Sequence, residues 1–257
     1  MRSGDFFISI NREGKLRVGS SGNTACEQIL RALEKGGHYM HIEPGFISAA
    51  KVMGANAAAA GLLFFYVKKL VRHPLDIIKV LLAALFFSVF MQGFHMNVGP
   101  SELHFIGAMS IYLTLGFIPT MFGFAAGLLL QGLLFDPIDL PHLAVNSLSL
   151  IVPLITVHYL AGRKLFDKGI RQRVSWPAIL KLDGIYYAGV TAMVGFWLLI
   201  GEVATPFSAW LSFAASYLAV VAVEPFITLL TVRTLKRYEG SPAVKRLFIV
   251  DRLKLKA

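Results

Sequence analysis

Stretches of mostly apolar residues follow one another along the chain, separated by short polar connections. Each is close to the roughly 20 residues that a helix needs to cross a bilayer. They span residues 49–67, 77–94, 103–118, 120–135, 143–161, 184–200 and 205–232. The pattern predicts an all-α integral membrane protein with seven transmembrane helices, occupying residues 40–232. Gly116 and Pro119 predict a tight turn between the third and fourth helices, because proline suits the first turn of a helix.

The composition supports a membrane protein and narrows the chemistry. Of the 257 residues, 56% are apolar and only 16% are charged, whereas about a quarter is typical of soluble domains. This excludes a disordered chain, a coiled coil and an ordinary cytosolic enzyme. Cys26 is the single cysteine, which excludes an internal disulfide, a cysteine-based zinc site and an iron–sulfur cluster.

The positions of the basic residues predict the orientation of the helices. Lysine and arginine gather in alternate connections and in the C-terminal segment: Lys68, Lys69, Arg72 and Lys79; Arg163, Lys164, Lys168, Arg171, Arg173 and Lys181; and eight residues of 233–257. The other connections hold none and carry Glu102, Asp136, Asp139 and Glu202 instead. Because basic loops stay in the cytoplasm, we expect an outer N-terminus and a basic cytoplasmic tail at 233–257. The formal net charge of +10 therefore reflects membrane orientation, and we expect no nucleic-acid partner.

Histidines cluster on the predicted outer side, at or near the mouths of the spans. They are His41, His95, His104 and His142, with Ser101 and Asn146 nearby. Neutral imidazole is the commonest protein ligand of transition metals, so the set suggests a nitrogen site for nickel, cobalt, copper or zinc. The alternative is that these histidines lie at the membrane interface and bind nothing.

Motifs for enzyme chemistry are absent from the sequence. There is no G-x-S-x-G, no H-E-x-x-H and no phosphate-binding glycine loop with lysine, so we expect no enzyme activity, and any ATP-driven step requires another chain. Glu224 is the one carboxylate that we expect deep in a span. An intramembrane acid is a candidate functional residue, but Glu224 could equally reach the interface or pair locally with Arg233.

One segment resembles a known family. Residues 40–48, Met-His-Ile-Glu-Pro-Gly-Phe-Ile-Ser, resemble the mature start of the CbiM/NikM family, the cobalt and nickel substrate-capture subunits of energy-coupling-factor (ECF) transporters of the ABC class. That family typically begins Met-His-Ile-Pro-Asp-Gly-Phe-Leu-Ser. The segment 94–107, which includes His104, is similar to the family's Gly/Ser-rich loop, and 135–146 is similar to its Phe-Gly-Asp…Asn block.

The resemblance implies a metal site. In the family the metal is held by the amine of the first residue, the backbone nitrogen and imidazole of the second, and a later histidine. Here these ligands correspond to Met40, His41 and His104. Ser101, Asn146, His95 and His142 are then supporting or alternative ligands. Glu43-Pro44, Glu102-Leu103 and Ser149 depart from the family pattern, and they affect the surroundings of the metal that tune its affinity.

The resemblance also implies partners and a location. The chain would have no cofactor of its own, would bind Co²⁺ or Ni²⁺ as substrate, and would rely on ATP used by partner subunits. Those partners are a transmembrane coupling (T) subunit, cytoplasmic ATPase subunits and a small accessory membrane protein. The expected location is the bacterial inner membrane.

Residues 1–39 conflict with this site, because anything attached to Met40 turns its amine into an amide. The segment also puts six lysines and arginines on the side that otherwise avoids them. We therefore expect 1–39 to be a start-site error or a removed segment. The opposing interpretation is a retained accessory element, with a small hairpin from Phe6–Ile10 and Leu16–Val18.

Two other functions fit a membrane protein with outer histidines. A capture subunit for an organic vitamin would need aromatic and hydrogen-bonding pocket residues but no free N-terminus. A membrane redox protein would hold haem or copper through the histidines and would be coloured when purified.

Overall fold

The computed structural model describes residues 7–10, 16–19, 47–98, 101–166 and 173–255, in two compact units, Met1–His38 and Tyr39–Ala257. In the first unit, strands β1 (Phe7–Ile10) and β2 (Leu16–Gly19) pair antiparallel, with Phe7 opposite Gly19. A hairpin at nearly these residues belongs to the opposing interpretation of the segment before Met40.

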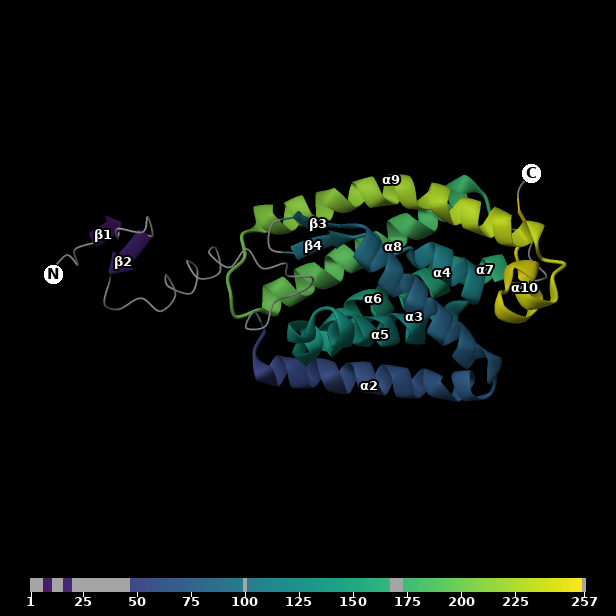
Figure 1. The fold of residues 1–257 in the computed structure, drawn as a ribbon, viewed down its shortest axis with the longest axis horizontal. Helices are drawn as coiled ribbons and strands as arrows, with labels where there is room; N and C mark the ends of the chain where they lie inside the picture. The colour runs from purple at the N-terminus through teal and green to yellow at the C-terminus, as the bar shows by residue number, and fades with distance from the viewer. Residues whose placement is uncertain (1–6, 11–15, 20–46, 99–100, 167–172, 256–257) are drawn as a thin grey trace. The chain divides into compact units, whose positions relative to one another are not determined.

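The second unit is a helical bundle with long, apolar helices (Figure 1). Within the described residues, six helical segments are long and apolar enough to cross a membrane. They are α2 (Ala49–Val71), α3 (Leu75–Gly93), α5 (Phe117–Leu134), α6 (Leu143–Val157) with its flanking turns, α8 (Trp176–Ile200) and α9 (Phe207–Arg237). The chain is therefore a multi-pass membrane protein.

The prediction of a seventh transmembrane helix at 103–118 is not met. That region contains the end of strand β4 (Ser101–His104), which pairs with β3 (His95–Val98), and the short helix α4 (Ala108–Leu115). Eight helical residues rise only about 12 Å, well short of a bilayer of roughly 30 Å. The predicted tight turn is present, since Gly116 alone separates α4 from α5 and has φ +95°.

The chain still passes from one end of the bundle to the other between β4 and α5. At one end, the Phe105 N–H donates to the Phe94 carbonyl at the end of α3, with an N···O distance of 3.0 Å. At the other end, Gly116 and Leu75 line the same cavity at the start of α3. An extended link and a short helix thus cover the height of α3.

Helix α4 lies at the centre of the core, which explains its all-round apolar sequence. All eight of its residues are buried, and α3, α5, α8 and α9 pack around it. The outer helices instead point large apolar side chains outward, including Phe64, Leu199 and Phe226, which are 72%, 85% and 61% exposed. Such faces suit lipid contact, because lipid tails are as apolar as these side chains.

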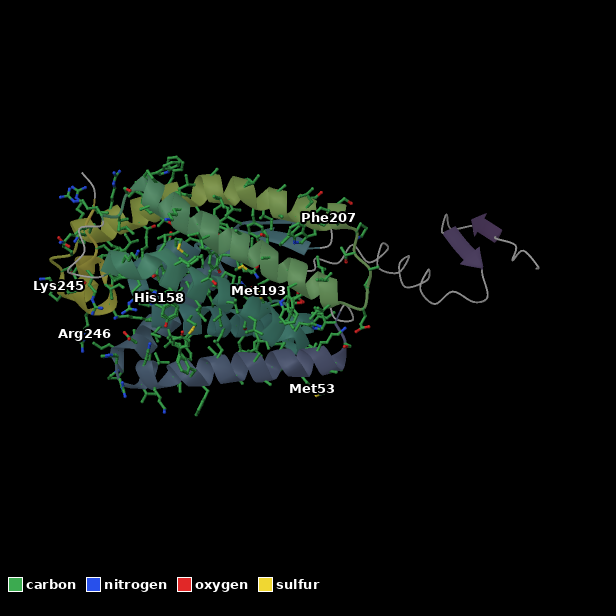
Figure 2. The ribbon with its side chains drawn as sticks, turned by 180° about the vertical axis from the view of Figure 1, so that it is seen from behind. Met53, His158, Met193, Phe207, Lys245 and Arg246 are labelled. Carbon is green, nitrogen blue, oxygen red and sulfur yellow. The ribbon has the colours of Figure 1, made fainter. Side chains whose placement is uncertain are left out.

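The three basic regions meet at one end of the bundle. A cavity of about 540 Å³ is lined there by Lys69, Lys79, His158, Phe166 and Arg252, among others. Figure 2 shows Lys245 and Arg246 at the end of the bundle where His158 lies, and Met53 and Phe207 toward the opposite end.

The segment after residue 232 is folded onto the bundle. Helix α9 continues to Arg237 and is followed by α10 (Pro242–Leu247) and the short turn η3 (Val250–Arg252). Val250 and Leu253 are buried, and the Ile249 N–H donates to the Thr114 carbonyl of α4, at 2.8 Å.

Two glycines allow α3 and α5 to pack closely. A Cβ at Gly123 would lie 2.3 Å from the Ala83 Cβ, and one at Gly127 would lie 2.5 Å from Phe87. Small residues let helices approach in this way inside membranes. The same seam also contains a polar contact. The Gln131 side-chain amide donates to the Ser88 carbonyl at 3.0 Å.

We expect Gly123→Val to lower the free energy of unfolding by about 1–3 kcal/mol, because the added side chain forces α3 and α5 apart. Unfolding in detergent micelles, followed by circular dichroism, measures the change. Gly61→Ala is the matched control, since nothing lies within 4 Å of a Cβ there. Equal stability of the two variants would contradict the close packing of this seam.

Candidate metal-binding site

His104 is held at the end of the β3–β4 hairpin. Its Cα pairs with that of His95, so the structure brings these two predicted residues to neighbouring positions of one small sheet. The His104 side chain is only 4% exposed. Ser101 begins β4 on the other side of the hairpin turn, opposite Val98.

The link from His104 to α4 is tightly packed. Phe105 contacts the rings of Phe90 and Phe94, with centroids 5.5 and 5.9 Å away. Gly107 then takes φ +64°, and a Cβ there would lie 2.4 Å from Phe90. Both the left-handed conformation and the close ring favour glycine at this position.

Because Gly107 precedes α4 without a side chain, the helix has no cap of its own. The cap comes from Glu224 of α9 instead. One carboxylate oxygen of Glu224 accepts from the Met109 N–H at 3.1 Å. A carboxylate at a helix N-terminus is stabilised by the unpaired N–H groups and by the helix dipole.

Glu224 is completely buried, so the alternative in which it reaches the interface beside Arg233 is wrong. Its second oxygen accepts a hydrogen bond from the Tyr187 hydroxyl of α8. The sequence marked Glu224 as a candidate but gave no partner, because Met109 and Tyr187 are far from it along the chain.

Asp183 is a second buried acid, and sequence reasoning missed it. It lies in α8 and has no exposed surface. The predicted span began at residue 184, whereas α8 begins at Trp176 with Pro177 in its first turn. Asp183 is four residues from Tyr187, so both lie on one helical face. This spacing was the signal in the sequence that could have identified Asp183.

His142 and Asn146 come from a different part of the bundle. His142 ends the turn η1 (Pro137–His142), and Asn146 lies one helical turn further along in α6; they are 4% and 6% exposed. Asn146 lines a cavity with Asp136 and Asp139 that is no larger than one water needs. Neither ring nitrogen of His142 has a hydrogen-bond partner in the described part of the chain.

Met40 and His41 lie outside the described residues. The first described residue after them is Ile47, which is buried with Ala55, Val145 and Trp197. Because α3 returns along the bundle after the short connection that follows α2, the start of α2 lies at the same end as Phe94 and the β3–β4 hairpin, as Figure 1 shows.

An ion pair ties the start of α2 to the end of α8. The Lys51 ammonium donates to the Ile200 carbonyl at 2.6 Å and to the Glu202 carboxylate at 2.7 Å. The hydrogen bond from Lys51 holds the pKa of Glu202 below its usual value. Lys51 thus joins the start of α2 to the end of α8.

No three histidine, cysteine, aspartate or glutamate side chains come together as a metal site within the described ranges.

Comparison with known families decides the class of the protein. Residues 41–241 match the sequence model of CbiM, described as the cobalt uptake substrate-specific transmembrane region. The chain belongs to the CbiM family. This CbiM-family chain is therefore a transport protein rather than an enzyme, as predicted, and the family's description supports transition-metal uptake. The resemblance found around Met40 to Ser48 is confirmed.

The fold is shared with a solved protein. A crystal structure of a transition metal transporter superposes on the chain with a TM-score of 0.63 and 22% sequence identity. The match covers 80% of this chain and 96% of the other. At this identity the likeness concerns the fold. No curated protein matches the sequence.

We expect Glu202→Gln to lower the unfolding temperature slightly at pH 7, because exposed ion pairs contribute little. A carboxyl whose pKa is depressed in the folded state stabilises the fold above its unfolded pKa, here 4.5, and loses this effect as the pH falls through its folded pKa. The difference from wild type should therefore shrink below about pH 4.5. Thermal unfolding at several pH values measures it. Lys51→Met, which removes the same pair, should show the same pH dependence, and a gap that stays constant with pH would contradict the assignment.

Proposed function

We propose that the chain is the substrate-binding membrane component of an ATP-driven energy-coupling-factor transporter that imports Co²⁺ or Ni²⁺. The metal, as substrate, is held by the N-terminal amine of Met40, by the backbone nitrogen and imidazole of His41, and by His104. The observation that carries the proposal is the buried His104, fixed at the end of the bundle where the chain from Met40 enters α2.

The length of the chain between His41 and Ile47 supports this ligand set. Ile47 is packed in the bundle, and five residues lie between it and His41. The six Cα–Cα steps of this stretch span up to about 20 Å when extended, so we expect His41 to reach the β3–β4 hairpin at the same end of the bundle. The family match also begins at His41, in agreement with a functional chain that starts at Met40.

The chemistry of these four nitrogens selects the metal. An amine, the next amide nitrogen and the imidazole of the second residue form fused chelate rings in one plane, and His104 completes the square. Planar nitrogen ligation suits Ni(II), Co(II) or Cu(II), whereas Zn(II) prefers a tetrahedron. His95, His142, Ser101 and Asn146 are supporting or alternative ligands in this scheme.

The proposal requires residues 1–39 to be absent from the working protein, as a start-site error or a removed segment. An amide nitrogen at Met40 lacks the basicity of an amine and does not bind the metal in the same way. The β1–β2 hairpin is then a small element outside the transporter proper.

The two ends of the bundle suggest the orientation and the partners. The basic end, with Lys69, Lys79 and Arg252, faces the cytoplasm of a bacterial inner membrane by the positive-inside rule, and His104 faces outward. Seven passes of the chain, with the β4–α4 segment as one of them, agree with this orientation. We expect a transmembrane coupling subunit, cytoplasmic ATPase subunits and a small accessory membrane protein as partners, the ATPases supplying the energy.

Native mass spectrometry of the protein purified in detergent from its own host tests the site. We expect a chain that begins at Met40 and takes up one Ni²⁺ or Co²⁺. His41→Ala and His104→Ala should abolish this uptake with normal expression, because each removes a ligand. The matched control is His73→Ala, in the basic α2–α3 connection.

Other results would contradict the site in distinguishable ways. A chain that retains residues 1–39 and binds metal would mean a different ligand set, with His95 or His142 among the ligands. A retained extension without metal would favour an organic substrate, and visible colour without added metal would favour a redox protein.

Metal affinity should fall as the pH is lowered. Binding releases the amide proton of His41, and it requires a free amine and neutral imidazoles. We expect the apparent affinity for Ni²⁺, measured by isothermal titration calorimetry, to drop at least tenfold from about pH 8 to about pH 6. A flat profile would exclude coordination by the amide nitrogen.

A further inference from the structure

Glu224 lies in the membrane core, far along the chain from His104, and the metal-binding scheme above does not use it. Its contacts nevertheless end on the segment that carries His104. We infer that Glu224 is a positioning residue that sets the location of His104 by holding the N-terminus of α4. This inference rests on the proposed function.

The first step of the argument is that His104 cannot move independently of α4. Only three residues separate them, and this link is fixed by the hydrogen bond from Phe105 to Phe94 and by the packing of Phe105 and Gly107 against Phe90. Ile106 and Ala108 are buried as well. A shift of α4 along its axis therefore shifts His104.

The second step is that α9 holds this segment at successive points. Glu224 and Thr228 are spaced by four residues, so they lie on one face of α9. Strand β4, which ends at His104, also packs against α9. Glu224 accepts from the Met109 N–H, and the Thr228 and Ser110 hydroxyls are 2.8 Å apart.

The third step is that the carboxylate of Glu224, unlike the other contacts of α9 with this segment, joins α4 to α8 as well. It binds α4 through the Met109 N–H, which lies in the first turn and has no partner within the helix, and it binds α8 through Tyr187. These bonds lie in a core without exposed surface, where an unmade hydrogen bond is costly. Glu224 thus fixes α4 relative to both α8 and α9.

Removing the carboxylate of Glu224 should weaken metal binding although no metal ligand is substituted. Loss of a group that orients a metal ligand typically costs 10- to 100-fold in affinity, and we expect Glu224→Ala to weaken Ni²⁺ binding by about that factor. Glu224→Gln keeps one acceptor oxygen for the Met109 N–H of α4, so the loss should be smaller. The absorption spectrum of bound Ni²⁺ in Glu224→Ala should differ from that of the wild type, because His104 is displaced from the metal.

The experiment is Ni²⁺ titration by calorimetry, together with the absorption spectrum, on the protein as purified from its own host. Trp210→Phe is the matched control, because it removes a different hydrogen bond between α9 and α8, from the Trp210 ring to the Thr191 carbonyl. It should change neither affinity nor spectrum. Thermal unfolding of each variant separates a general loss of stability from a displaced ligand.

The outcomes distinguish this inference from the proposed function. If His104→Ala binds Ni²⁺ as the wild type does, the proposed site is wrong and the inference falls with it. If His104→Ala loses Ni²⁺ while folded Glu224→Ala keeps wild-type affinity and spectrum, only the inference is wrong.

A second variant decides the case in which Glu224→Ala does not fold. Thr228→Val removes the α9 hydroxyl that bonds the Ser110 hydroxyl of α4 and leaves the carboxylate in place, so we expect it to fold. It should weaken Ni²⁺ binding by about three- to tenfold, at the lower end of the effect of such supporting contacts, and shift the spectrum in the same direction. An unchanged affinity and spectrum in this variant would overturn the inference that α9 positions His104.

Discussion

In a helix of eight residues, the N–H groups of the first turn and the carbonyl groups of the last turn have no hydrogen-bond partner within the helix. In the core of a membrane protein, no bulk water reaches these groups to replace such partners. Helix α4 meets this constraint through distant parts of the chain. The Met109 N–H in its first turn binds Glu224 of α9, and its Thr114 carbonyl accepts from Ile249 in the C-terminal segment. The centre of the bundle therefore depends on the last helix and on the segment after it.

This arrangement connects the two ends of the molecule through one element. The β3–β4 hairpin and His104 precede α4 at one end. Gly116, Ile249 and the basic cavity follow it at the other. A substrate site at one end and a surface for partner subunits at the other would both contact the same short helix, whose position is set by polar bonds rather than by its length.

Acids buried within an apolar core, together with large apolar side chains on the outside, distinguish this bundle from a soluble protein. Asp183 and Glu224 are buried, as are three tyrosines of α8 and α9, while large apolar side chains face outward. Between helices, association comes from close packing at glycines, as along α3 and α5, and from hydrogen bonds such as that of Gln131. Apolar side chains alone cannot select one arrangement in lipid, because lipid solvates them equally well.

The sequence by itself determined most of the helices, the grouping of basic residues at one end and the family, since hydropathy, charge and the motif at Met40 are local properties. It also singled out His104 and Glu224. Only the tertiary structure decided that residues 103–118 form a strand and a short helix, that Asp183 is buried and that Glu224 caps α4. An apolar run looks the same whether lipid or protein surrounds it, and the partners of Glu224 are more than a hundred residues away in α4 and 37 residues away in α8. Hydrogen bonds between such distant segments exist only once the bundle has formed, so no local sequence pattern predicts them.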